Sequence, residues 1–235
     1  MTAPLLKCPV SDPSEHNLDC AFARIRVVAV LLAAGTASRM GGRPKCLLQV
    51  NGQPLAQGLL QALALAGVDE TVLVLGHCAE QVQNALAHFS ALNMPVCQVL
   101  NSSPQDGQNS SLRIGLAKAN TLAADWVMVA LADQPLINAQ DLQDLIAAVK
   151  LRPPGTRMLV PQVDGLPGNP VLFDASVMAE ILTATPDMGG KQWQQAHPTS
   201  VYQWATANTH YRIDVDSPAD IDALAATSGL RLQWD

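Results

Sequence analysis

The chain has 235 residues, of which 49% are hydrophobic, 14% charged and 4% aromatic, and its formal net charge is −6. This length predicts one large α/β domain or two small ones, with a core made of Ala, Val, Leu and Ile. The negative charge argues against a nucleic acid or an anionic membrane surface as the main partner, because phosphate polymers need a broad basic face.

The cysteines argue against a disulfide framework or a structural zinc site, because their number is odd and no C-x-x-C pair occurs. Dispersed thiols are typical of a reducing compartment. The N-terminal residues lack the apolar stretch of a signal peptide, and no window reaches the roughly 18 apolar residues that span a membrane. We therefore expect a cytoplasmic protein with a flexible tail over 1–24 and a single domain over 25–235. The five cysteines are Cys8, Cys20, Cys46, Cys78 and Cys97.

Strand-like and helix-like segments alternate through the first two thirds of the chain. Apolar runs predict strands, and helical spacing of the apolar residues predicts helices between them. Asn138 is a plausible N-cap of the fourth helix. The predicted strands are 26–34, 69–76, 95–101 and 125–133, and the predicted helices are 54–67, 78–89, 109–120 and 138–150.

The last third is less regular. Residues 157–173 look like a β-hairpin with a Gly/Pro turn, and 211–226 look like a strand, a turn and a last helix that begins near Ser217. The alternation predicts an α/β fold with a mainly parallel sheet and helices on both faces. Ligands of such sheets bind beyond the carboxyl ends of the strands.

A glycine-rich basic loop follows the first strand, "LAAGTASRMGGRPK" over 32–45. Glycines let the backbone approach a ligand with its N–H groups, and Arg39 and Lys45 add positive charge, while Arg43 is expected to be solvated. The loop fits a triphosphate, although it matches neither G-x-x-x-x-G-K-[ST] nor G-x-G-x-x-G. The alternative is a solvated strand–helix connection.

Carboxylates stand at two other points. Asp133 ends the fourth strand in "LADQPLI", where it could hold Mg²⁺ or simply form a turn before Pro135. Asp214 and Asp216 alternate in "IDVDSPADI", where strand geometry would place both on one face. Helix capping is the alternative, and it suits Asp216 or Ser217 better than Asp214. Together with the basic loop, these acids would make a magnesium–triphosphate site.

These motifs, in this order, resemble the MobA-like nucleotidyltransferase family, which has a Rossmann-like (GT-A type) three-layer fold. "LAAGTASRMGGRPK" and "LADQPLI" resemble its general motifs. "GLPGNPVLF", "PDMGGKQW" and "IDVDSPADI" resemble those of its branch of molybdenum cofactor cytidylyltransferases. The likeness covers about residues 27 to 226. It implies Mg²⁺-dependent transfer of CMP from CTP to the terminal phosphate of molybdopterin, with release of pyrophosphate.

The resemblance also implies roles for individual residues. Arg39, Lys45 and Asp133 would be catalytic, and Asp133 would hold the metal with Asp214 or, less favoured, Asp216. The acceptor would meet Gly168, Asn169 and Lys191. The nucleotide would meet Leu32, Ala33, Ala34, Gly35, Gly107 and Ser111.

Residues 33–35 read Ala-Ala-Gly, which resembles the cytidylyl branch more than the guanylyl branch with its usual Ala-Gly-Gly. GTP or another phosphorylated acceptor remains an alternative. Two positions depart from the pattern: Ala37 replaces a serine, and Lys191 replaces an arginine, which keeps the charge but loses bidentate geometry. The implied partners are CTP or GTP, a molybdopterin-type acceptor, and a molybdoenzyme or its chaperone.

Two other classes of function remain open. A non-catalytic carrier of molybdenum cofactor would be expected to lack Lys45 or Asp133, and both are present. A nicotinamide oxidoreductase is suggested by the β-α-β pattern alone, and the missing G-x-G-x-x-G counts against it.

Overall fold

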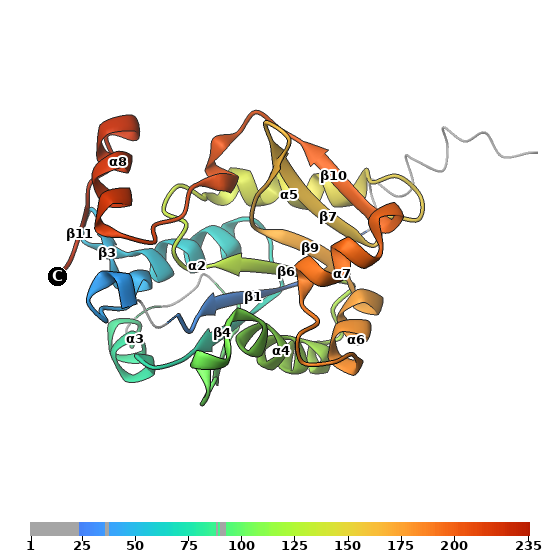
Figure 1. The fold of residues 1–235 in the computed structure, drawn as a ribbon, viewed down its shortest axis with the longest axis horizontal. Helices are drawn as coiled ribbons and strands as arrows, with labels where there is room; N and C mark the ends of the chain where they lie inside the picture. Colours follow the sequence, from blue (N-terminus) through green and yellow to red (C-terminus); the bar gives the residue numbers. More distant parts are fainter. Residues whose placement is uncertain (1–23, 36–37, 88, 90–92) are drawn as a thin grey trace, which may run out of the picture.

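The computed structural model describes residues 24–35, 38–87, 89 and 93–235 (Figure 1). Its centre is an eight-stranded sheet in the order β10-β7-β9-β6-β1-β4-β5, with β8 paired to β7. The strands β5, β4, β1 and β6 run parallel, β9 runs antiparallel to both of its neighbours, and β10 runs parallel to β7. The strands are β1 (Val27–Ala33), β4 (Glu70–Leu75), β5 (Val96–Leu100), β6 (Trp126–Leu131), β7 (Met158–Val163), β8 (Leu166–Pro167), β9 (Val171–Asp174) and β10 (Val201–Ala205).

Strand β1 lies in the middle of this sheet, which explains its unbroken apolar sequence. Ala29 and Leu31 face one buried cluster, whereas Val28 and Val30 face the other, and all four are fully buried. Successive side chains of a strand point to opposite faces. A strand covered on both faces therefore needs an apolar residue at every position.

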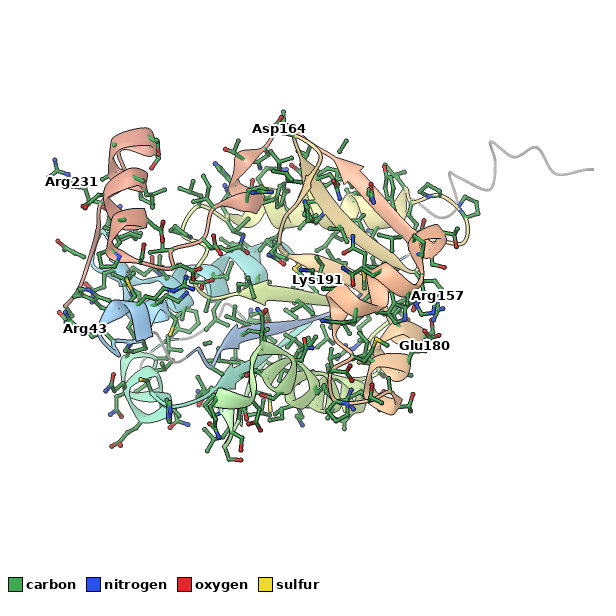
Figure 2. The ribbon with its side chains drawn as sticks, viewed as in Figure 1. Arg43, Arg157, Asp164, Glu180, Lys191 and Arg231 are labelled. Carbon is green, nitrogen blue, oxygen red and sulfur yellow. The ribbon has the colours of Figure 1, made fainter. Side chains whose placement is uncertain are left out.

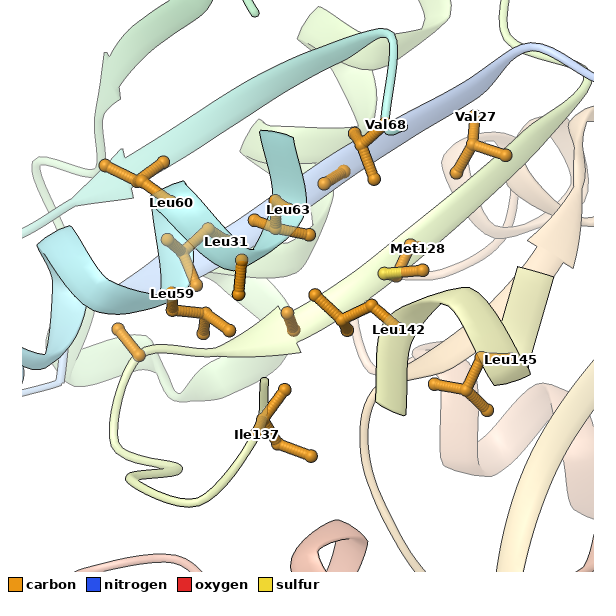
Figure 3. Close-up of a cluster of buried hydrophobic side chains, with 14 of the residues drawn as sticks. Val27, Leu31, Leu59, Leu60, Leu63, Val68, Met128, Ile137, Leu142 and Leu145 are labelled. Carbon is orange, nitrogen blue, oxygen red and sulfur yellow. The ribbon is translucent and has the colours of Figure 1, made fainter. Parts of the chain in front are cut away.

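The two clusters place the helices in two layers. Leucines of α2 and α5 pack on one face of the sheet against Leu31 and Met128 (Figure 3). Leu116 of α4, Ile181 of α6 and Trp193 of α7 pack on the other face. The predicted three-layer, Rossmann-like α/β fold is confirmed. These helices are α2 (Leu55–Leu65), α3 (Ala79–Ala85), α4 (Gln108–Ala119), α5 (Ala139–Lys150), α6 (Ala175–Thr183) and α7 (Gly190–Ala196).

A third apolar cluster lies at one end of the molecule. It joins Met40, Val215, Leu224 and Leu232, under α8 (Pro218–Ser228) and a small antiparallel sheet of β11 (Leu232–Gln233), β2 (Gln49–Val50) and β3 (Gln53–Pro54). The 3-10 turns are η1 (Ser38–Met40), η2 (Lys45–Leu47), η3 (Pro104–Asp106), η4 (Asn120–Leu122), η5 (Pro198–Ser200) and η6 (Thr209–Arg212).

Several local predictions can now be checked. Asn138 caps α5 in a capping box with Asp141, and Ser217 caps α8 with Asp220, as the sequence indicates. The strand predicted within 211–216 is wrong: η6 is followed by irregular backbone, because Val215 N–H bonds to Asp133 O, which lies in a loop. The helix predicted over 78–89 ends at Ala85.

The predicted tail over 1–24 lies almost wholly outside the described residues, as do Thr36 and Ala37. Among the helices that the structure describes, none combines the length and apolar character needed to cross a bilayer.

The packing of α4 on the sheet can be tested at Gly115. A Cβ atom there would overlap Val30 Cγ1 and lie 2.8 Å from Val74 Cγ2. We expect Gly115→Ala to lower the free energy of unfolding by about 1–3 kcal/mol, measured by urea denaturation, because a filled core resists added volume. Gly58→Ala in α2 is the matched control, since its Cβ meets open space, and it should stabilise the protein by about 0.5–1 kcal/mol. Equal effects of the two variants would contradict this packing.

Candidate active site

A pocket of about 630 Å³ opens at the carboxyl ends of β1 and β6. Sequence position alone predicted this edge, and the structure brings most of the predicted residues to it. Arg39 lies outside the lining, whereas Gly168 and Lys191 line a neighbouring pocket. The predicted residues that line the first pocket are Leu32, Ala33, Ala34, Gly35, Lys45, Gly107, Ser111, Asp133, Asn169, Asp214 and Asp216.

Lys45 forms the centre of charge in this pocket. Its Nζ lies 2.6 Å from Asp133 Oδ2 and 2.6 Å from Asp216 Oδ1. The Arg39 guanidinium lies 3.5 Å from the other oxygen of Asp216. The Lys45 and Asp133 side chains are only 17% and 19% exposed. The basic loop and both acidic motifs therefore converge on one point, and Asp216 is bound to Lys45 rather than used as a helix cap.

Burial and charge act in opposite directions on these groups. Burial lowers the pKa of Lys45, but the carboxylates of Asp133 and Asp216 outweigh it and leave the pKa above its usual value. Burial, followed by the charges of Asp133 and Asp216, raises the pKa of Asp214. Asp214 thus stands among like charges that an added cation would relieve.

The acidic groups fit part of a divalent-metal site. Asp133 Oδ1 is buried and has no hydrogen-bond partner within the described chain, so an oxygen ligand is available. No set of three His, Cys, Asp or Glu side chains in the described ranges converges closely enough to hold a metal alone. This fits Mg²⁺, which proteins often bind through one or two carboxylates together with substrate phosphates.

The opposite side of the pocket is built from the start of α4. Ser111 lines the pocket, and its Oγ accepts a hydrogen bond from Asn101 Nδ2 at 2.9 Å. Asn101 also accepts from Ser103 N–H and thereby fixes the loop that leads to Gly107. Asn101 begins the stretch 101–112 that the resemblance implies would close over the base, but it was not singled out there, although its place directly after a strand at the same sheet edge was a usable signal. The N-cap position of α4 is Gly107, which has no side-chain cap, so the helix begins at Gln108 rather than at the predicted Asn109.

A second pocket of about 570 Å³ adjoins the first. Leu32, Gln108, Leu131 and Asn169 line both pockets, so the two share a wall. Lys191 is the one charged side chain among the described residues that line the second pocket, and it stands at the start of α7 (Figure 2). The carboxamides that surround this pocket are Gln108, Asn109, Asn169, Gln194, Gln195 and Gln203.

The loop that carries Gly168 and Asn169 is held by main-chain contacts. Asn169 N–H donates to Tyr211 O at 2.8 Å, and a Cβ atom on Gly168 would lie 2.5 Å from that same oxygen. Only a glycine fits at position 168, because the Tyr211 backbone leaves no room for a Cβ atom. Gln134, which is 4% exposed, donates to Asn169 O at 3.3 Å. Sequence analysis missed Gln134, because its role depends on contacts between distant segments.

Helix α7 is anchored away from the pocket. Trp193 is buried, and its Nε1 donates to Glu180 at 2.7 Å. Arg157 donates to the other oxygen of Glu180 at 2.6 Å, and the two side chains lie side by side in Figure 2. These contacts fix the helix from which Lys191 projects.

Comparison with known proteins identifies the family. The model of the MobA-like NTP transferase domain matches residues 29–201. The chain belongs to the MobA-like NTP transferase family. The predicted family is thus confirmed, and with it the enzyme class of nucleotidyltransferases.

The relatives differ in what they are named for. The chain is 30% identical to nicotine blue oxidoreductase of Paenarthrobacter nicotinovorans over 181 residues, which cover 73% of this chain and 83% of that protein. It is also 33% identical to the bifunctional protein GlmU of Staphylococcus epidermidis over 126 residues. This match covers 50% of this chain and 25% of that protein.

A solved structure resembles almost the whole molecule. Rv0371c of Mycobacterium tuberculosis H37Rv is 26% identical, with a TM-score of 0.67 over 86% of this chain and 99% of that one. Rv0371c has also been solved as a complex with manganese, which superimposes with a TM-score of 0.64. A divalent cation is therefore bound by a member of this structural group.

Cys46 provides a test of how closed the floor of the pocket is. Burial raises the pKa of its thiol to about 12, so almost no thiolate is present at pH 8. We expect iodoacetamide to modify Cys46 at least about tenfold more slowly than the half-exposed Cys78, because the thiolate is the nucleophile. Peptide mass spectrometry distinguishes the sites, and urea should equalise the rates. Equal rates in the folded protein would show that Lys45 stands in a more open site.

Proposed function

We propose that this protein transfers CMP from CTP to the terminal phosphate of a molybdopterin-type acceptor and releases pyrophosphate. The single observation that carries the proposal is Lys45, bound to Asp133 and Asp216 in the lining of a pocket that shares a wall with a second one. A cation between carboxylates, beside a second cavity, suits a metal–triphosphate group whose α-phosphorus meets an acceptor bound in that cavity.

The first pocket accommodates the nucleotide. The backbone of Ala33 to Gly35 would hold the base and ribose, with Gly107 and Ser111 on the opposite side. Arg39 and Lys45 would neutralise the triphosphate and the departing pyrophosphate. The Ala-Ala-Gly sequence favours CTP, and GTP remains the alternative within this reaction class.

Asp133 and Asp214 would hold Mg²⁺, with Asp216 as the alternative ligand. The ion would supply positive charge to the phosphates during transfer. Lys45 occupies the carboxylate pair in the structure. Binding of a metal–nucleotide complex would compete for these oxygens, and Lys45 would then turn to the phosphates.

The second pocket suits an acceptor with one anionic group. Lys191 offers a single positive charge, Gly168 lines this pocket, and Asn169 lines both pockets. Carboxamides offer both donors and acceptors to an uncharged heterocycle. Both features agree with a molybdopterin-type acceptor, and a molybdoenzyme or its chaperone would receive the product.

A redox reaction is the second candidate, because one relative at 30% identity is named as an oxidoreductase. A fold does not decide function, and the charged site must be tested directly. A carrier without catalysis is disfavoured by the presence of both Lys45 and Asp133.

The proposal predicts the choice of nucleotide. In single-turnover assays with Mg²⁺ and molybdopterin, we expect pyrophosphate release from CTP to exceed that from GTP, UTP or ATP. A preference for GTP would overturn the assignment of CTP but keep the reaction class. Binding of NADH without binding of any nucleoside triphosphate would instead favour the redox candidate.

The metal assignment predicts the effect of Asp133→Asn. Loss of a metal ligand and of the partner of Lys45 should lower turnover by several orders of magnitude, roughly 10³-fold, with an unchanged circular dichroism spectrum. Mn²⁺ binding in the presence of CTP, measured by electron paramagnetic resonance, should weaken in parallel. Asp164→Asn, in the hairpin turn labelled in Figure 2 and outside the lining of both pockets, is the control and should retain full turnover. Normal turnover of Asp133→Asn would remove Asp133 from the metal site.

A further inference from the structure

The basic loop contains a turn with few hydrogen bonds among its described residues. Gly41 and Gly42 both have positive φ, at 66° and 78°. A long hydrogen bond of 3.4 Å from Arg43 N to Met40 O closes the turn, and the Cys78 thiol makes a weak contact of 3.8 Å with Gly42 O. Glycines gain much conformational entropy when released. Arg39 and Lys45 stand on the two sides of this turn, so their positions depend on anchors outside it.

The first anchor is Met40, which is only 6% exposed. It packs in the third apolar cluster with Leu224, Leu232 and Val215. Val215 lies between Asp214 and Asp216, so one cluster supports both the residue next to Arg39 and the acidic pair opposite it.

The second anchor is Arg43, on the other side of the two glycines. Its guanidinium carbon lies 4.4 Å from the centre of the Trp234 ring, which is a cation–π contact. Arg43 is thus not merely solvated, as the sequence suggested. Figure 2 shows it at the end of the molecule where β11 and the C-terminus lie.

Trp234 is itself held in place by the neighbouring strand. Leu232 and Gln233 pair with Val50 and Gln49 of β2, and Trp234 packs against the third cluster. The C-terminal segment therefore holds the loop through the contact between Trp234 and Arg43, and it packs in the same apolar cluster as Met40. This segment lies beyond residues 29–201, which the family model matches.

We propose that Trp234 is a positioning residue for the triphosphate end of the active site. It fixes Arg43, and through it the glycine turn, so that Arg39 and Lys45 are held at the acidic pair, within reach of the phosphates, before the nucleotide arrives. Trp234 contacts no substrate; its effect is to reduce the ordering that binding would otherwise require. The proposal rests on the proposed function only in requiring that the first pocket binds a nucleoside triphosphate.

The test measures the affinity of CTP with Mg²⁺ by isothermal titration calorimetry in four variants of the full chain. We expect Trp234→Ala and Arg43→Ala each to raise the Kd about three- to tenfold, from the loss of the cation–π contact and of ordering. Trp234→Phe keeps an aromatic face and should stay within about twofold of wild type. The double variant Arg43→Ala/Trp234→Ala should bind CTP with a Kd no higher than that of the more weakly binding single variant, because the two substitutions remove the same interaction.

Each outcome decides the proposal. A Kd for Trp234→Ala equal to that of wild type overturns the proposal. The same holds if Trp234→Ala and Trp234→Phe both lower the Tm while the Kd of both variants stays at the wild-type value. Additive effects in the double variant also overturn it, because Arg43 would then touch the phosphates directly. If wild type binds neither CTP nor GTP, UTP or ATP, the proposed function fails as well. If wild type binds a nucleotide and the variants bind it with the same Kd, the proposed role of Trp234 fails and the proposed function stands.

Discussion

The active-site half of this molecule depends on the ion pairs of one ammonium group with two carboxylates. Lys45 joins the basic loop, the end of β6 through Asp133, and the segment before α8 through Asp216. These three segments are distant in sequence and adjoin in space. Since unpaired charges at partly buried sites are costly, each of the three groups fixes the other two. The pairing holds the arrangement together but can be exchanged. Phosphates could replace the carboxylates as partners of Lys45, and a divalent cation could replace Lys45 as the partner of the carboxylates.

The sheet sets where this exchange can take place. Parallel β1 and β6 bring their carboxyl ends to one edge, where Leu32 pairs with Leu131 and accepts a hydrogen bond from Ala132 N, one residue before Asp133. The antiparallel β9 follows β6 in the sheet. It places Asn169, just before its start, at the same edge. Because β9 runs antiparallel to β6, the loop before β9 lies at the edge that carries the first pocket, and the second pocket forms beside it.

The features that sequence could predict were local or periodic. The apolar run of β1, the capping box at Asn138 and the order of the charged motifs require no knowledge of distant contacts. Asn101, Gln134 and Trp234 were missed, because a lone carboxamide or a tryptophan near a chain end has no pattern of its own. Asp216 is predicted as a less favoured metal ligand than Asp214, and the structure adds its ion pair with Lys45, which the sequence did not indicate. Such roles follow from tertiary contacts, which periodicity does not contain.

The wall between the pockets also bears on the chemistry. The residues that line both are two leucines and two carboxamides, Leu32, Leu131, Gln108 and Asn169. None of these side chains is a nucleophile of the kind that forms covalent enzyme intermediates. Under the proposed function, this lining agrees with direct attack by an acceptor phosphate on the nucleotide, for which placement and charge neutralisation would supply the rate. The main-chain contacts that fix Asn169 would then set the distance between the reacting groups, and Lys45 would set the charge.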